Sequence, residues 1–110
     1  HIKLIVNVCN YINERYTENI KMDDIANIAG FSKFHFARLF KQVMNISWYD
    51  YLINRRIMQA EKLLTGSDLS IMQVAMKSGF GSLATFNRVF KSKRQCTPTE
   101  YRFFYGRKNA

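Results

Sequence analysis

Apolar residues recur along the chain at intervals of three and four residues, the spacing that places them on one face of an α-helix. The clearest case lies between residues 32 and 44. One face of this stretch is apolar and is predicted to be buried; it carries Phe36, Leu39, Phe40 and Val43. A second face, roughly 200° away, is predicted to point outward; it carries Phe34, Ala37, Arg38 and Lys41.

The motif around this helix occurs twice. A-x-x-x-G-F followed by S-x-x-x-F-x-R-x-F-K covers residues 26–41 and again residues 75–91. The offset is 49 residues before the glycine turn and 50 after it, because Gly81 is an extra residue in the second copy. In that copy the predicted inward residues are Phe86, Val89 and Phe90, and the outward ones are Ala84, Asn87, Arg88 and Lys91. Such a repeat indicates two copies of one helical unit.

Each copy also carries signals for the ends of its helices. Gly30 and Gly79 are predicted to end a short helix, because glycine adopts the left-handed conformation without steric cost. The short helix of the second copy is expected to begin with a capping box at Ser70. The first copy lacks such a cap, but Asp23 and Asp24 suit the positive end of a helix dipole.

Another helix is predicted after each outward-facing one. Ser47 and Thr97 are the expected N-caps, and proline directly after Thr97 strengthens the second start. No proline or glycine interrupts residues 48–65, which indicates one connecting helix, roughly 27 Å long at about 1.5 Å per residue. The predicted architecture is all-α and forms one domain: a first helix-turn-helix subdomain at 1–47, the connecting helix at 48–65 and a second helix-turn-helix subdomain at 66–110.

The chain is strongly basic. Its 110 residues include 17 Lys and Arg against 8 Asp and Glu, a formal net charge of +9. This balance favours a polyanionic partner, although a basic surface can also serve solubility alone. Placement favours nucleic acid, because basic residues lie on or beside the two outward faces: Lys33, Arg38, Lys41, Arg88 and Lys91.

Other chemistry is sparse in the sequence. Cys9 and Cys96 have neither metal-ligand spacing nor the pattern of a disulfide framework, and we predict reduced packing residues. No cofactor or metal is expected, and the patterns of catalytic triads, paired acids and phosphate-binding loops are missing, so an enzyme is not expected. No apolar run is long enough to cross a bilayer, and a cytoplasmic location is expected. Because the chain begins with His1 rather than methionine, we expect a fragment or a processed form of a longer protein.

A helix with a basic outward face that follows a short turn has the form that a DNA major groove accepts. The groove is wide enough for an α-helix, and arginine can form two hydrogen bonds there to guanine O6 and N7. The groove returns to one side of the duplex every ~34 Å, so a connecting helix of about 27 Å suits two helices bound on that side. The repeat therefore predicts a bipartite site read by one chain.

Over essentially its whole length the chain resembles the AraC/XylS family of transcription regulators. The resemblance rests on I-A-x-x-A-G-F-S and F-x-R-L-F-K in the first half, R-R-I-x-x-A-x-x-L-L in the middle, and V-A-x-x-x-G-F, F-x-R-V-F-K and T-P-x-x-Y-R in the second half. It implies a domain of about seven helices, in which two helix-turn-helix units bind an asymmetric site on double-stranded DNA. The recognition helices would be residues 32–44 and 82–94. A sensor or dimerisation domain outside this chain is also implied, and RNA polymerase is a second candidate partner.

The resemblance assigns roles to residues of both recognition helices. By position, eight residues would face bases: Lys33, Phe34, Ala37, Arg38, Leu83, Ala84, Asn87 and Arg88. Ala37, Leu83 and Ala84 lack side-chain donors and could offer only apolar contacts, for example to a thymine methyl group. Base reading is therefore expected to depend on Arg38, Arg88 and Asn87, with Lys33 as a further candidate. Contacts to phosphates position the protein on DNA without specifying the base sequence. They are expected from Ser32, His35, Lys41, Ser82, Thr85 and Lys91.

The residues that follow the recognition helices depart from the family. Members usually carry glycine at the positions of Asn45 and Gln95. Asparagine tolerates a left-handed conformation, whereas glutamine there is expected to cost some stability.

Several alternatives remain open at this point. Phe34 could contact a thymine methyl group or a sugar, or it could pack on a neighbouring helix. The aromatic tail, Tyr101, Phe103, Phe104 and Tyr105, is predicted to close the second core, and its alternative role is a stacking platform for single strands. For the whole chain the alternatives are non-specific nucleic-acid binding by the same basic faces and a protein-interaction module.

Overall fold

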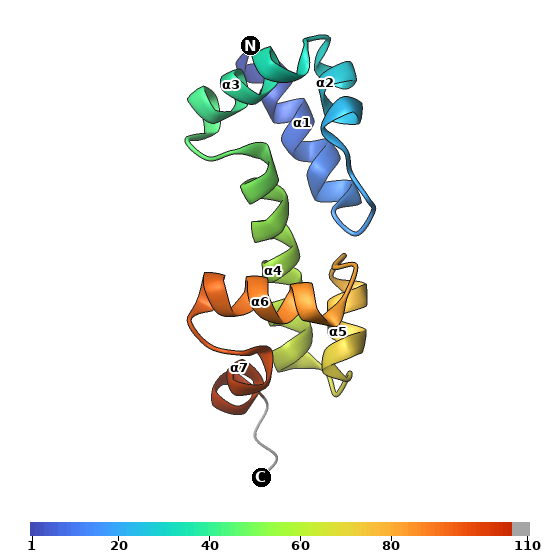
Figure 1. Cartoon of the computed structure of the whole chain (residues 1–110), viewed down its shortest axis with the longest axis vertical. Coiled ribbons are helices and arrows are strands. Elements are labelled where there is room, and N and C mark those ends of the chain that lie inside the picture. The colour runs from blue at the N-terminus through green and yellow to red at the C-terminus, as the bar shows by residue number, and fades with distance from the viewer. Residues whose placement is uncertain (107–110) are drawn as a thin grey trace. The chain divides into compact units, whose positions relative to one another are not determined.

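The computed structural model describes residues 1–106, which form seven α-helices and no strand (Figure 1). The all-α prediction is confirmed. The last four residues of the predicted second subdomain lie outside the described range. The helices are α1 (Ile2–Arg15), α2 (Met22–Ala29), α3 (Lys33–Met44), α4 (Trp48–Gly66), α5 (Ile71–Lys77), α6 (Leu83–Arg94) and α7 (Pro98–Tyr105).

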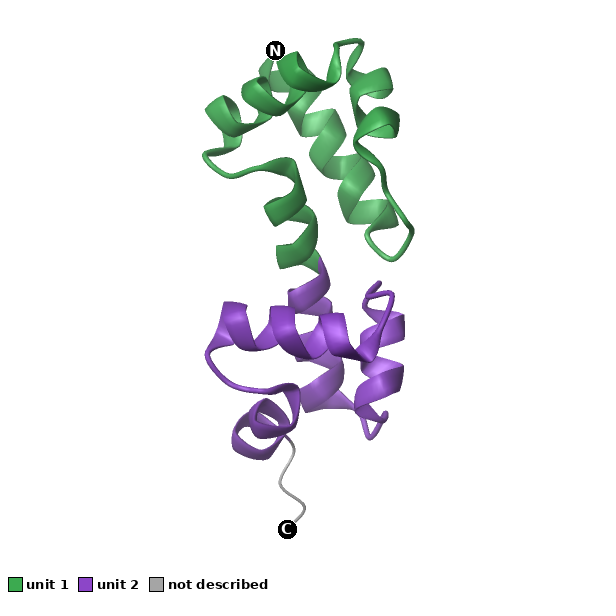
Figure 2. Cartoon of the chain, viewed as in Figure 1, with its two compact units in different colours: residues 1–55 green, residues 56–110 purple. Residues whose placement is uncertain are grey.

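The chain divides into two compact units, His1–Arg55 and Arg56–Ala110 (Figure 2). The division falls within α4, so each unit contains one part of the predicted connecting helix. Each unit has its own buried residues.

The first unit is built on the apolar stripes of its helices. Helices α1, α2 and α3 contact one another, and Leu52 at the start of α4 joins their core. Phe36 and Phe40 are completely buried, and the ring of Phe40 meets that of Tyr51 edge-on at 6.0 Å. Burial of these two phenylalanines fixes the rotation of α3 about its axis, which leaves Arg38 exposed.

The second unit repeats this arrangement. Phe86 and Phe90 of α6 are completely buried, and Phe90 meets Tyr101 of α7 edge-on at 5.4 Å. The remaining core residues of this unit come from α4, α5, α7 and the turn before α6: Ile57, Ala60, Leu64, Val74, Ala75, Phe80 and Pro98. The rotation of α6 is fixed as that of α3 is, and Arg88 is exposed.

The helix-end signals act as predicted. Ser70 with Gln73 and Thr97 with Glu100 each form a complete capping box. Helix α2 begins without a side-chain cap and has acidic residues in its first turn. Gly30 has a φ of +76°, a left-handed conformation that favours glycine.

Asn45 and Gln95 both adopt the left-handed conformation at the ends of α3 and α6, with φ of 65° and 64°. Their backbone amides donate to the carbonyls of Lys41 and Lys91 at 2.8 and 2.9 Å. Both positions therefore have the conformation for which glycine is the usual residue.

The prediction for the aromatic tail is wrong for three of its four residues. Tyr101 packs on Phe90, but Phe103, Phe104 and Tyr105 are 76%, 62% and 65% exposed. The reason is helical geometry: at roughly 100° per residue, Phe103 lies about 200° from Tyr101, whereas Phe104 lies about 60° from it but in the last turn of α7. Tyr105 returns to that face and lies against the Tyr101 ring at 4.8 Å, but only at the end of α7.

Candidate nucleic-acid interface

The same backbone hydrogen bond closes the turn before each recognition helix, α3 and α6. In each turn the amide of a phenylalanine donates to an alanine carbonyl, Phe31 to Ala26 at 3.1 Å and Phe80 to Ala75 at 3.0 Å. A serine N-cap follows in both turns, directly after Phe31 in the first and after the extra Gly81 in the second. The direction in which each recognition helix leaves its turn is therefore set by the repeated part of the sequence.

The serine caps have a structural role of their own. Ser32 Oγ accepts from the His35 amide at 3.3 Å, and Ser82 Oγ accepts from the Thr85 amide at 3.1 Å. Ser82 Oγ also donates to Thr85 Oγ1 at 3.0 Å, an arrangement that leaves the Thr85 hydroxyl hydrogen for another acceptor. The positive end of a helix suits a phosphate, and these hydroxyls lie at that end.

The residues predicted to read bases lie on the outward part of each helix. Arg38 and Arg88 are exposed, and no hydrogen bond or ion pair engages either guanidinium within residues 1–106. Ala37 and Leu83 are half-buried, so they offer less surface than predicted. The other predicted contact residues are exposed, except for the half-buried Thr85: Ser32, Lys33, Phe34, His35, Lys41, Ser82, Ala84, Asn87 and Lys91.

Phe34 is 81% exposed, the highest exposure among the large apolar residues of the described chain. It therefore does not pack on a neighbouring helix within that range, and this alternative is wrong. The adjacent His35 is also exposed, but its ring lies 4.5 Å from that of Phe31. A ring that contacts its own turn in this way is partly held in place beside the start of α3.

Lys33 has a partner that the sequence reading did not predict. Its Nζ lies 2.9 Å from Asp23 Oδ1, and both side chains are more than half exposed. Asp23 belongs to the first turn of α2, where its negative charge was expected to interact favourably with the positive end of the helix dipole. The ion pair thus joins the two helices of the first helix-turn-helix motif.

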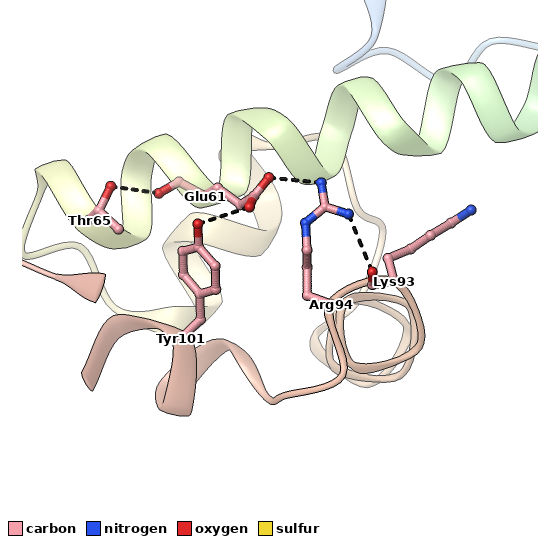
Figure 3. Close-up of polar contacts among 5 residues, drawn as sticks. All are labelled: Glu61, Thr65, Lys93, Arg94 and Tyr101. Atoms are coloured by element: carbon pink, nitrogen blue, oxygen red, sulfur yellow. Dashed lines mark hydrogen bonds and ion pairs between the residues drawn. The ribbon is translucent and has the colours of Figure 1, made fainter. Parts of the chain in front are cut away.

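A network of polar side chains ties α6 and α7 to α4 in the second unit (Figure 3). Glu61 Oε1 accepts from Arg94 Nη2 at 2.9 Å, and Glu61 Oε2 accepts from Tyr101 Oη at 2.9 Å. Burial raises the pKa of Glu61, but the hydrogen bonds from Arg94 and Tyr101 outweigh it, so the pKa lies below its usual value. Burial and the bond to Glu61 raise the pKa of Tyr101 to about 12.

The first unit has an uncharged counterpart of this network. Tyr51, which corresponds to Tyr101 in the repeat, donates from Oη to Asn13 Oδ1 at 3.0 Å. In both units, therefore, a tyrosine after the recognition helix is hydrogen-bonded to the helix that precedes the helix-turn-helix motif. The 50-residue offset of the repeat relates the two tyrosines, but it does not indicate their acceptors, Asn13 and Glu61, which lie 38 and 40 residues away.

Comparison with known proteins decides the family. The helix-turn-helix domain family of AraC/XylS type matches residues 25–103. The chain belongs to this family. The AraC/XylS resemblance is thus confirmed, as is the prediction that the chain is not an enzyme. As a member of the family, the chain is a sequence-specific DNA-binding domain for transcription regulation.

Individual proteins of the AraC/XylS type are also similar to the chain in sequence or structure. The probable transcription factor PqrA of Proteus vulgaris is 42% identical over 85 residues, which cover 77% of this chain and 70% of PqrA. The regulatory protein SoxS of Escherichia coli K12 is 32% identical over 102 residues, covering 93% and 95%. Among solved structures, the DNA-binding domain of AdpA, determined in complex with a target DNA, has a TM-score of 0.86 at 29% identity, with 92% and 91% covered.

The other expectations concern location and partners. Among the described residues no helix is long and apolar enough to span a membrane. The cytoplasmic location, RNA polymerase and an additional sensor or dimerisation domain remain predictions.

Proposed function

We propose that this AraC/XylS-type domain binds an asymmetric site on double-stranded DNA by placing α3 and α6 in successive major-groove segments. One observation carries the proposal: Arg38 and Arg88 occupy the same position in the two copies, exposed and without a partner in the described chain. Buried phenylalanines fix the rotation of both helices, so each arginine is presented at a defined angle. An exposed arginine on a groove helix can form a bidentate pair with guanine.

The two helices differ in what they can read. In α3 the arginine is accompanied by the exposed Lys33 and Phe34. In α6 it is accompanied by Asn87, whose amide can pair with adenine N6 and N7, and by the small Ala84. Because these side chains differ, the two halves of the site differ in sequence, and an asymmetric site follows.

Phosphate contacts provide the rest of the proposed binding surface. Lys41 and Lys91 are exposed in the last turns of α3 and α6, and the serine caps lie at the opposite ends of these helices. Such contacts fix the register of the protein on the duplex and make its affinity depend on salt. A duplex of any sequence meets them, so they supply the non-specific part of the affinity.

The test is a selection of bound duplexes from a random library, followed by affinity measurements at fixed salt. Arg38→Ala and Arg88→Ala should each weaken binding to the selected duplex by about 1–3 kcal/mol and relax discrimination at particular base pairs. Arg15→Ala removes the same charge from α1 and is the control. Equal losses for Arg38→Ala on the selected duplex and on random DNA would contradict direct base reading. Failure to enrich any sequence would favour the non-specific alternative, and no salt-dependent binding would favour an interaction module.

A further inference from the structure

The ion pair between Asp23 and Lys33 lies where the two helices of the first helix-turn-helix motif meet. Its atoms are 2.9 Å apart, and the side chains are 60% and 54% exposed, so both groups are accessible to a ligand. Lys33 is the first residue of α3, one of the two helices proposed to enter the groove. The pair therefore places a negative charge at the edge of a surface that must approach a polyanion.

The stability of α3 by itself does not favour a lysine at position 33. A lysine in the first turn of a helix meets the positive end of the dipole, where an acidic residue is favoured. Helix α3 has no acidic residue in its first turn. The unfavourable charge is instead compensated from outside the helix, by Asp23 of α2.

The second unit shows that the two residues change together. With the offset of 49 residues before the turn and 50 after it, Asp23 corresponds to Met72 and Lys33 corresponds to Leu83. The unit that has the lysine has the aspartate, and the unit that lacks one lacks both. The neighbouring Asp24 corresponds to Gln73, which forms the capping box of α5. This difference concerns the helix end rather than the ion pair.

We propose that Asp23 is a positioning residue that sets the specificity of the first unit, an inference that rests on the proposed function. A free lysine at the start of a groove helix can reach the nearest phosphate of any sequence, which raises non-specific affinity. Asp23 holds the ammonium group on the α2 side of the turn and repels phosphate from it. Lys33 then leaves Asp23 only where a better acceptor, such as a guanine edge, faces it.

The experiment compares Asp23→Asn with Asp24→Asn in the whole chain. Both variants lose one negative charge from the first turn of α2, but only the first releases Lys33. The probes are the duplex selected by the wild-type chain and a random-sequence duplex of equal length, each titrated over a range of salt concentrations. Lys33→Met, alone and combined with Asp23→Asn, completes the cycle.

For Asp23→Asn we expect tighter binding to the random duplex and a salt slope steeper by about 0.9, the value for one added phosphate contact. The affinity ratio between selected and random duplexes should fall several-fold. Asp24→Asn should leave the slope and the ratio near their wild-type values, and Lys33→Met should abolish the effect of Asp23→Asn on the slope.

Three outcomes separate the hypotheses. The inference is overturned if Asp23→Asn and Asp24→Asn change the slope equally, because general charge repulsion would then explain both. It is also overturned if Asp23→Asn steepens the slope in the Lys33→Met background. If the wild-type chain itself prefers no duplex, the proposed function fails, and this is seen before any variant is compared.

Discussion

Replacing Glu61 with glutamine is the sharpest test of what holds the second unit together. The substitution keeps the shape of the side chain and one carbonyl oxygen, but it removes the charge that Arg94 and Tyr101 share. Because the favourable contacts outweigh the cost of burial, as the lowered pKa of Glu61 indicates, Glu61→Gln should destabilise the protein.

The magnitude follows from the two hydrogen bonds at 2.9 Å. A bond to a charged group contributes about 1.5–3 kcal/mol and a neutral one about 0.5–1.5 kcal/mol. In Glu61→Gln the Tyr101 bond becomes neutral, and the Arg94 bond keeps only the charge of its guanidinium, so at about 1 kcal/mol each the two bonds lose about 2 kcal/mol in all. The side chains of Glu61 and Arg94 are 22% and 32% exposed, and solvent screening reduces the loss to about 1–1.5 kcal/mol. For a domain of this size that lowers the melting temperature by about 5–10 °C.

The assay is urea unfolding followed by far-ultraviolet circular dichroism, at neutral pH and in acid. Glu14→Gln is the matched control, because it makes the same chemical change at an exposed position of α1 and should alter the free energy of unfolding by less than about 0.5 kcal/mol. The pKa of Glu61 is lower in the folded state than the usual value of a glutamate carboxyl group. Its contribution is therefore complete above that value and disappears as the pH falls through the folded pKa, where wild type and Glu61→Gln should converge.

A double-mutant cycle supplies the result that would refute this reasoning. Glu61 and Tyr101 are in contact, so the effects of Glu61→Gln and Tyr101→Phe should be less than additive in the double variant. Strict additivity, or a Glu61→Gln variant as stable as the wild type at neutral pH, would show that the network does not stabilise the fold.

Three further results are expected. The stability advantage of the wild type over Tyr101→Phe should be complete below pH 10 and should disappear between pH 10 and about 12, the raised pKa of Tyr101, in an alkaline unfolding series. Gln95→Gly should raise the free energy of unfolding by about 1 kcal/mol, because it relieves a left-handed glutamine, and Asn45→Gly should raise it less; equal gains in urea unfolding would contradict this. Lys41→Ala should weaken all duplexes alike and lower the salt slope by about one unit, and an unchanged slope would remove Lys41 from the phosphate contacts.

Local signals made most of the fold predictable. The connecting helix was expected over 48–65 and runs from Trp48 to Gly66, because no helix breaker interrupts the stretch and a serine cap precedes it. The rotation of the recognition helices was also predictable, since a buried phenylalanine pair four residues apart defines one face. The outward placement of Arg38 and Arg88 followed from it.

Contacts between distant residues were not predictable in the same way. Glu61 and Arg94 are 33 residues apart, and nothing in the helical period of either segment indicates that they meet. Asp23 was attributed to the helix dipole because its sequence neighbours explain it, whereas Lys33 lies across a turn. The prediction for the aromatic tail was wrong for a related reason. Its aromatic composition suggested that the whole tail is buried, although only one face of α7 packs against the core.

The separation of each recognition helix into a buried and an exposed face bears on how this protein could change. Phe36 and Phe90 hold their units together, while Phe34, Ala84 and Asn87 are exposed and differ between the copies. Substitutions at exposed helix positions usually change stability by less than about 0.5 kcal/mol. If the proposed function holds, new preferences for DNA sequence could therefore evolve, or be selected from a library, one helix at a time. The folded scaffold would persist, and the other helix would keep its half of the old site.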